Sequence, residues 1–205
     1  MKSEGAVFVL DDDADVCRSL ADLLEEAGLT VRAYRTARAF LAACGDPGPA
    51  CLVLDMCMPG MSGIRVLEQI VAQKAYIPVV VASGYGDVSL AAHAMKIGAI
   101  DFIEKPFRAR QLLDCVREAL DLARQNHRSR TEHTELARRI GRLSARECQM
   151  LKRLTRGETV KEVARTLERS YNTVYKQKQR LMRKLDVHSR DELERVAARA
   201  GLAEV

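Results

Sequence analysis

The chain has 205 residues, of which 47 % are hydrophobic, and a formal net charge of +5. This length permits a sizeable buried core in one or two domains. No apolar run approaches the roughly 18 residues of a membrane-spanning helix and no signal peptide precedes the first apolar run, so we expect a cytoplasmic protein without membrane contact. Its six cysteines show no CxxC spacing, which favours reduced thiols over metal ligands or disulfides.

The charge is distributed unevenly along the chain. Residues 1–123 contain 12 Lys and Arg against 17 Asp and Glu, a net charge of −5, whereas residues 124–205 contain 21 against 11, a net charge of +10. We therefore expect an acidic domain joined to a basic one. The basic part predicts a polyanionic partner, nucleic acid before membrane; a solvated charged surface is the alternative.

The acidic part alternates short apolar runs, which indicate strands, with segments whose apolar residues recur every three or four positions, which indicate helices. We predict strands at 6–10, 29–34, 51–54, 77–82 and 100–103, and helices at 16–27, 37–44, 64–73, 88–95 and 109–120. Each parallel connection needs a crossover to return the chain. The alternation therefore predicts an α/β fold with a doubly wound, five-stranded parallel sheet.

Four of the predicted strands are followed by polar side chains that suit a phosphate or a metal. Asp11 and Asp12 follow the first strand, Asp55 the third, Ser83 the fourth and Lys105 the fifth. The carboxyl ends of parallel strands meet at one edge of a sheet, where such proteins bind ligands. Each residue alone has a simpler interpretation, such as a helix N-cap for Asp11. Their convergence favours a functional site.

Neighbouring carboxylates cannot all ionise without a cation, so this site predicts an oxygen-liganded divalent ion, for which we choose Mg²⁺. Phosphoryl transfer is the matching chemistry. Asp55 is then the nucleophile, while Asp11 and Asp12 hold the metal directly or through water. Lys105 pairs with a phosphoryl oxygen, and Ser83 hydrogen-bonds the phosphorylated form.

The motifs VFVLDDD, LVLDMCMPGMSG, VVVASGYGD and GAIDFIEKPF, in this order, resemble the signatures of receiver domains of two-component response regulators, over residues 6–122. The resemblance implies a flavodoxin-like receiver that accepts a phosphoryl group from a histidine kinase on Asp55. It implies Mg²⁺ bound by Asp12, Asp55 and the backbone carbonyl of Cys57. It also implies a cis peptide at Lys105-Pro106.

The same resemblance implies a switch made by Ser83 and Phe102, and it places Cys57 and Tyr85 facing the phosphoryl group. A phosphoryl group adds a charge of about −1.5 to −2, which gives the Ser83 hydroxyl a reason to move inward. That movement opens room for Phe102. The alternative is that Phe102, as a strand residue, belongs simply to the core.

Residues 124–142, RQNHRSRTEHTELARRIGR, are polar and compatible with a helix. We expect a solvated helix that continues the preceding one, with a coiled coil as the alternative because a weak three-and-four spacing persists.

The basic part carries signals for successive short helices. Ser144 with Glu147 and Thr159 with Glu162 are capping-box patterns, and Gly157 predicts the end of the first helix. A third helix, capped by Ser170, has its apolar positions at Tyr171, Val174, Leu181 and Leu185. Two short helices with a tight connection form a helix-turn-helix.

Residues 143–193 resemble the LuxR-type helix-turn-helix, and a receiver followed by this module is similar to the NarL/FixJ group of response regulators. By analogy, Lys176 and Gln179 reach bases. The residues expected to contact the DNA backbone or to pack are Thr173, Tyr175, Lys178, Arg180 and Lys184. The last helix, around Leu193, Val196 and Ala197, is expected to supply a dimer surface.

We therefore predict a receiver domain at 1–123, a helical linker at 124–142 and an all-α, LuxR-type helix-turn-helix domain at 143–205. The expected protein is a transcription regulator whose phosphorylation on Asp55 promotes dimerisation and promoter binding. It is not an enzyme beyond assisting its own phosphoryl transfer and dephosphorylation. Expected partners are a histidine kinase, promoter DNA and a second copy of the chain, with RNA polymerase as a further candidate.

Two alternatives stay open. The first is a phosphatase with an aspartyl-phosphate intermediate, although such an enzyme would need a second acid two residues after the nucleophile, at the position of Cys57. The second is a DNA-binding protein whose receiver is a dimerisation scaffold and is never phosphorylated.

Overall fold

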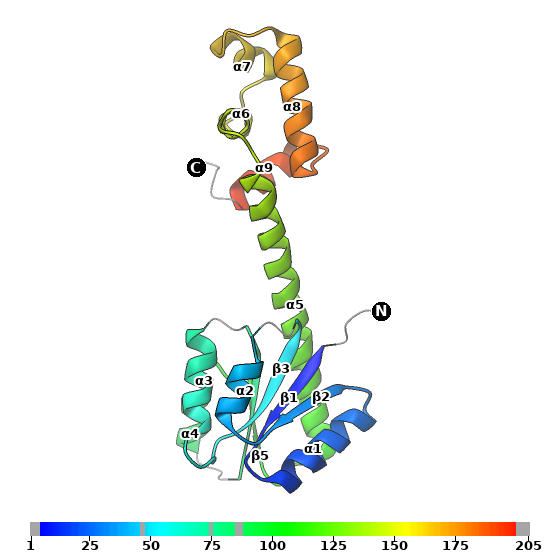
Figure 1. Ribbon diagram of the computed structural model, residues 1–205, viewed down its shortest axis with the longest axis vertical. Coiled ribbons are helices and arrows are strands. Elements are labelled where there is room, and N and C mark those ends of the chain that lie inside the picture. Colours follow the sequence, from blue (N-terminus) through cyan, green and yellow to red (C-terminus); the bar gives the residue numbers. More distant parts are fainter. Residues whose placement is uncertain (1–4, 46–47, 74–75, 85–87, 200–205) are drawn as a thin grey trace. The chain divides into compact units, whose positions relative to one another are not determined.

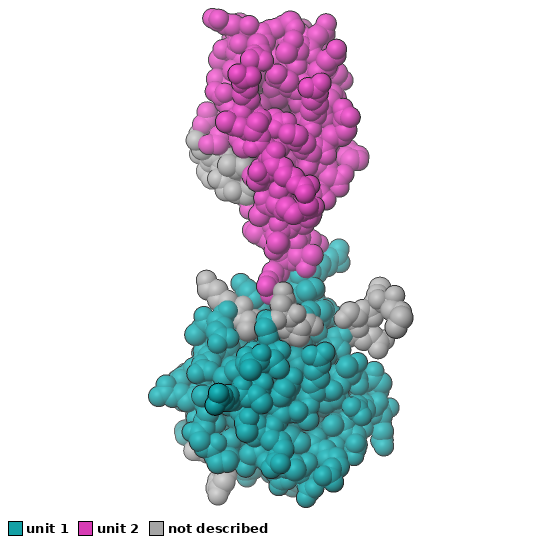
Figure 2. Space-filling model, in the orientation of Figure 1, with its two compact units in different colours: residues 1–128 teal, residues 129–205 magenta. Residues whose placement is uncertain are grey.

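The computed structural model describes residues 5–45, 48–73, 76–84 and 88–199, so Tyr85 lies outside the described residues (Figure 1). The chain divides into two compact units, unit 1 (Met1–Arg128) and unit 2 (Ser129–Val205) (Figure 2). Among the described helices, none is long and apolar enough to cross a membrane. The six cysteines are all free, and Cys17, Cys44 and Cys51 are buried.

Within its described residues, unit 1 is built on a five-stranded sheet in the order β2-β1-β3-β4-β5 (Figure 1). The strands are β1 (Ala6–Leu10), β2 (Thr30–Tyr34), β3 (Ala50–Asp55), β4 (Val79–Ser83) and β5 (Asp101–Glu104). All four neighbouring pairs are parallel. This is the strand order of flavodoxin-like sheets, which confirms the predicted doubly wound α/β fold.

Helices cover both faces of this sheet because the central strands are apolar on both sides. They are α1 (Ala14–Glu26), α2 (Ala37–Ala43), α3 (Gly63–Ala72), α4 (Val88–Ile97) and α5 (Ala109–Gly141). On one face, Phe8 and Leu52 pack in one core with residues of α2, α3 and α4. On the other face, Val9 and Val53 pack in a second core with residues of α1 and α5. The central strands are therefore buried apart from Ala6 at the start of β1, and their carboxyl ends lie along one edge of the sheet.

The N-terminal end of α1 is fixed by Asp13, whose side chain accepts hydrogen bonds from the backbone N–H groups of Asp15 and Val16. The helix therefore begins at Ala14, two residues before the predicted start. Because Asp13 provides the cap, Asp11 is not the N-cap and its carboxylate is available to the strand edge.

Helix α5 is one continuous helix of 33 residues that includes most of the segment predicted as a solvated helical linker. The division between the two units falls within it, at Arg128 and Ser129. Near its end, Ile140 packs against the core of unit 2, as does Leu143 just beyond it. The predicted continuation of the fifth helix is thus confirmed, and its last turns contribute to the packing of unit 2.

Unit 2 is all helical in its described residues after α5, with α6 (Ala145–Thr155), α7 (Val160–Thr166), α8 (Tyr171–Leu185) and α9 (Arg190–Arg199). Both predicted capping boxes are present, Ser144 with Glu147 and Thr159 with Glu162. The core holds Met150, Leu151, Val163, Val174, Leu181 and Leu185, together with Leu193 and Ala197 from α9.

In unit 2, one of the apolar positions expected for α8 is not buried. Tyr171, the first of these apolar positions, is 48 % exposed, whereas Val174, Leu181 and Leu185 are buried. The expectation that the last helix, around Leu193, Val196 and Ala197, supplies a dimer surface stays a prediction. Val196 packs against the core of unit 2, and Leu193 and Ala197 are buried within that core.

Candidate functional site

The carboxyl ends of β1, β3, β4 and β5 bring the predicted polar residues to one edge of the sheet. Asp11 directly follows β1, and Asp55 and Ser83 are the last residues of β3 and β4. Lys105 follows β5, and its backbone N–H continues the strand pairing by donating to the Ser83 carbonyl oxygen at 2.8 Å. The peptide bond between Lys105 and Pro106 is cis, as the resemblance implied.

The amine of Lys105 bridges two buried carboxylates. Its Nζ lies 2.6 Å from Asp11 Oδ2 and 2.8 Å from Asp55 Oδ1. Burial lowers the pKa of Lys105, but hydrogen bonds and attraction from the two aspartates outweigh burial, so that the pKa lies above its ordinary value. The ammonium is therefore charged at neutral pH, and it provides the positive charge that two adjacent carboxylates need.

The second oxygen of each carboxylate is held by the backbone. Asp55 Oδ2 accepts a hydrogen bond of 2.7 Å from the backbone N–H of Cys57, and Asp11 Oδ1 accepts one of 3.0 Å from Asp13. Asp55 thus has one oxygen on Lys105 and one on the loop after β3. These two contacts fix the orientation of the carboxylate, and each oxygen keeps a further lone pair as acceptor.

Gly63 at the start of α3 supports this loop, a role that the motif analysis missed. A Cβ atom built at residue 63 would collide with the backbone carbonyl oxygen of Asp55 and would lie 2.8 Å from Met56 Cα. The Gly63 N–H also donates to the Met56 carbonyl oxygen at 3.2 Å. Only glycine permits this close approach of α3 to the end of β3.

The donor chemistry at this edge fits a hard divalent cation. Asp11, Asp12 and Asp55 offer carboxylate oxygens, the ligands that Mg²⁺ prefers. In the described part of the chain, however, no three His, Cys, Asp or Glu side chains already form a ligand group. The positive charge between Asp11 and Asp55 comes from Lys105 instead.

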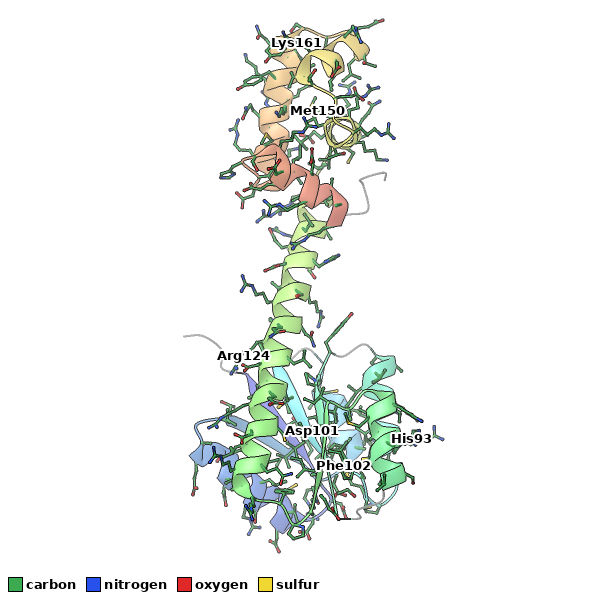
Figure 3. The ribbon with its side chains drawn as sticks, turned by 180° about the vertical axis from the view of Figure 1, so that it is seen from behind. His93, Asp101, Phe102, Arg124, Met150 and Lys161 are labelled. Carbon is green, nitrogen blue, oxygen red and sulfur yellow. The ribbon has the colours of Figure 1, made fainter. Side chains whose placement is uncertain are left out.

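The two residues of the implied switch occupy different environments. Ser83 is fully buried at the end of β4. Phe102 on β5 is partly buried and packs against the core beneath α2, α3 and α4, while its backbone N–H donates to Asp101 Oδ1 at 2.8 Å (Figure 3). Phe102 therefore lies at the rim of the core.

In unit 2, helices α7 and α8 are joined by a short turn in which Glu168 has a φ of 51°. Ser170 caps α8 through its hydroxyl, which accepts from the Thr173 N–H at 3.3 Å. Helix α8 carries five basic side chains and no acidic one. Of the residues predicted to contact DNA, Thr173, Tyr175, Lys176, Gln179, Arg180 and Lys184 are exposed, and Lys178 is partly buried.

Lys184 is exposed but already has a partner in unit 2. Its Nζ lies 2.7 Å from Glu147 Oε2, the carboxylate that also accepts from the Ser144 backbone N–H in the capping box of α6. The hydrogen bond from Lys184, followed by that from Ser144, holds the pKa of Glu147 below its ordinary value. Lys184 thus ties the end of α8 to the start of α6.

Comparison with known proteins connects these two sites. Residues 7–117 match the family model of the response regulator receiver domain, and residues 142–197 match that of bacterial regulatory proteins of the luxR family. The chain belongs to the response regulators. Its receiver contains the Asp55 site, and its LuxR-type domain contains α8.

Relatives share this arrangement over nearly the whole length. The response regulator is 38 % identical to the transcriptional regulatory protein FixJ of Bradyrhizobium diazoefficiens over 98 % of each chain. It is 39 % identical to the response regulator protein TodT of Pseudomonas putida, over 94 % of this chain and 85 % of TodT. The structure of the response regulator StyR matches with a TM-score of 0.87 and 37 % identity, over 95 % of this chain and 98 % of that one.

These findings establish the class of protein. The chain is a two-component transcriptional regulator of the NarL/FixJ type, with a receiver and a LuxR-type DNA-binding domain, rather than a classical enzyme. Such an architecture implies a histidine kinase and DNA as partners.

Proposed function

We propose that this response regulator accepts a phosphoryl group on Asp55 from a histidine kinase, and that phosphorylation promotes dimerisation and promoter binding. The observation that carries the proposal is the bridge of Lys105 between Asp11 and Asp55. In the reaction, a carboxylate oxygen of Asp55 attacks the phosphorus of a phosphohistidine. The P–N bond breaks as the P–O bond forms, and the imidazole leaves with a proton from solvent.

The chain's own residues have separate roles in this step. The hydrogen bond from the Cys57 N–H orients Asp55, and Lys105, already 2.8 Å from that carboxylate, pairs with an incoming phosphoryl oxygen. Asp12, Asp55 and the backbone carbonyl of Cys57, supported by Asp11, are the residues that would hold Mg²⁺. When bound, this ion supplies positive charge to the transferring phosphoryl oxygens.

In the phosphorylated receiver, we expect the side chains of Ser83 on β4 and Phe102 on β5 to change position. The Ser83 hydroxyl would move inward to hydrogen-bond the phosphoryl oxygens. The Phe102 side chain would then turn into the space that the hydroxyl leaves. The partial burial of Phe102 at the rim of the core supports this proposal, because a rim side chain can change its position at lower cost than a central one.

The activation step is tested with acetyl phosphate as phosphodonor, in the presence and absence of Mg²⁺. We expect the full chain to gain the mass of one phosphoryl group, to sediment as a dimer and to bind tighter to a duplex selected from a randomised pool. Asp55→Asn should show none of these changes. Asp22→Asn, which removes an exposed carboxylate on α1, is the matched control and should behave as the wild type.

Other results would support the alternatives. Equal mass, affinity and oligomeric state for wild type and Asp55→Asn would contradict phosphorylation at Asp55. DNA binding by a constitutive dimer that never gains mass would favour the alternative in which the receiver is only a dimerisation scaffold. Sustained turnover of phosphate esters would favour the phosphatase.

For the output domain, we propose that α8 contacts DNA through Thr173, Tyr175, Lys176, Lys178, Gln179, Arg180 and Lys184. Lys176 and Gln179 are both exposed, which supports their assignment to base contacts. Replacing either by Ala should relax specificity at one position, with a loss of about 1–3 kcal/mol. Lys178→Ala should instead weaken binding to all sequences and reduce the salt dependence by about one charge.

A further inference from the structure

Two tyrosines on α8 form an exposed aromatic pair that neither the core nor the capping of the helix explains. Tyr171 is 48 % exposed and Tyr175 is 44 % exposed. Their ring centroids lie 6.0 Å apart with an interplanar angle of 17°, so the rings are stacked. Neither ring belongs to the core of unit 2, which takes Val174 from this part of the helix. An aromatic surface of this kind on a charged helix indicates a binding contact.

The position of the pair on α8 indicates what it faces. Tyr171 is the first residue of the helix, directly after the cap Ser170, and Tyr175 follows one turn later. Gln179 is a further four residues along, so it continues the same face of the helix. In a helix-turn-helix, the N-terminal residues of the second helix contact base edges in the major groove. The tyrosine pair therefore occupies the part of α8 that enters a groove.

The surrounding charge favours DNA over a protein partner. Helix α8 has five basic and no acidic side chains, and Lys176 follows Tyr175 directly in the sequence. In the major groove, the thymine C5-methyl group is the apolar feature on the base edges, and aromatic or methyl-bearing side chains contact it. Tyrosine hydroxyl groups can at the same time bind phosphate oxygens.

We propose that the stacked rings of Tyr171 and Tyr175 form an apolar contact with the methyl group of one thymine in each half-site, and that Tyr171 is a specificity-determining residue. The proposal rests on the DNA binding proposed above for α8. It adds Tyr171 to the DNA contacts proposed above, and it names the base that this residue recognises.

The first experiment selects duplexes from a randomised pool with the phosphodonor-treated full chain. Wild type and Tyr171→Phe should select a thymine at one fixed position of each half-site. Tyr171→Ala and Tyr171→Gln should lose the preference at that position and keep the rest of the consensus. Tyr76→Ala, which removes an exposed tyrosine of unit 1, is the matched control and should select the wild-type consensus.

The second experiment replaces that thymine by deoxyuridine, which removes only the methyl group. The affinity of wild type and of Tyr171→Phe should fall about fourfold, as expected for one buried methyl group. The affinity of Tyr171→Ala and Tyr171→Gln should not change. Gln is included because it favours helix, so that the result does not depend on one substitution.

The outcomes separate this inference from the proposed function. A wild-type consensus that Tyr171→Ala and Tyr171→Gln both retain, or an equal loss with deoxyuridine in all variants, would overturn the thymine contact and leave DNA binding intact. Failure of the wild type to select any consensus would overturn both. Loss of binding to a protein partner but not to DNA in the Tyr171 variants would also overturn the inference.

Discussion

Arg139 near the end of α5 donates a hydrogen bond from Nη1 to the backbone carbonyl oxygen of Leu185, the last residue of α8, at 3.0 Å. The same atom lies 3.2 Å from the carboxylate of Asp186, which ends α8 in a left-handed conformation. The last carbonyl groups of a helix have no partner within it. Arg139 supplies one, and it thereby attaches the end of α5 to the end of the proposed DNA-contacting helix.

We expect Arg139→Gln to destabilise unit 2 by about 1 kcal/mol, the net contribution of a partly exposed hydrogen bond. The neighbouring Arg138→Gln is the matched control, because both arginines pair with Glu135 but only Arg139 reaches α8. Amide hydrogen exchange in the last turn of α8 measures the difference. Equal exchange in the two variants would show that the contact with Leu185 contributes nothing.

Gly63 lies against the backbone of Asp55, the proposed phosphoryl acceptor. Gly63→Ala introduces a Cβ that collides with the backbone of Asp55 and Met56, so either α3 or the end of β3 must move. We expect a loss of about 1–3 kcal/mol in stability, the usual cost of overpacking. Phosphorylation by acetyl phosphate should slow, because Asp55 moves with its strand.

Gly45→Ala is the control for this substitution, since among the described residues nothing beyond its chain neighbours lies within 4 Å of a Cβ at residue 45. It should leave both the urea denaturation midpoint and the rate of mass gain as in the wild type. A Gly63→Ala variant that matched Gly45→Ala in both measurements would be inconsistent with the close approach.

The strand-end site was predictable from sequence because parallel strands deliver their following residues to one edge. Asp11, Asp55 and Lys105 needed only the apolar runs before them to be placed together. The hydrogen bond from Cys57 was not predictable, because it depends on the path of a loop with no periodicity. Gly63 was missed for the same reason: its constraint comes from a backbone passing close by, which no spacing pattern records.

In unit 2, capping patterns predicted the helix starts correctly, because a cap depends only on the residues of the first helical turn. Helical spacing was less reliable for burial. Tyr171 lies three residues before the buried Val174, yet at the first position of the helix it is 48 % exposed. The apolar stripe of the last helix did not reveal whether it packs against the same chain or against another copy, and Leu193 and Ala197 are buried in their own unit.

Removal of the bridging lysine should leave Asp11 and Asp55 without a cation. We expect Lys105→Met to lose about 3 kcal/mol of stability, because two buried carboxylates are then uncompensated. Mg²⁺ should raise the melting temperature of this variant more than that of the wild type, whereas K⁺ at equal ionic strength should not. Thermal denaturation with and without Mg²⁺ measures this, and an equal shift in both proteins would contradict a cation site at these carboxylates.

The pH dependence of the same contact follows from the direction of the lysine's pKa. The pKa of Lys105 lies above its ordinary value of 10.5, so its stabilising contribution is complete below that pH and is lost only as the pH rises further. The wild type and Lys105→Met should therefore converge in stability under strongly alkaline conditions and differ throughout the neutral range.

The pair of Glu147 and Lys184 gives the opposite pH dependence in unit 2. The hydrogen bonds from Lys184 and Ser144 hold the pKa of Glu147 below its ordinary value of 4.5. The stabilising contribution is therefore complete above pH 4.5 and is lost as the pH falls through the lowered pKa. Glu147→Gln keeps an oxygen for the capping box but removes the charge, so we expect a loss of about 0.5–1 kcal/mol at neutral pH that disappears in acid.

Hydrogen exchange of α6 and α8 as a function of pH measures this loss locally, without interference from carboxylates of unit 1. Glu194→Gln, which breaks an exposed pair with Arg190 within α9, is the matched control and should change little at any pH, because that pair joins neighbours on one helix. The pair of Glu147 and Lys184 joins two helices instead. An equal effect of Glu147→Gln and Glu194→Gln on hydrogen exchange at neutral pH would show that the attachment of α8 to α6 does not depend on this ion pair. The role of Lys184 would then be limited to the proposed contact with DNA.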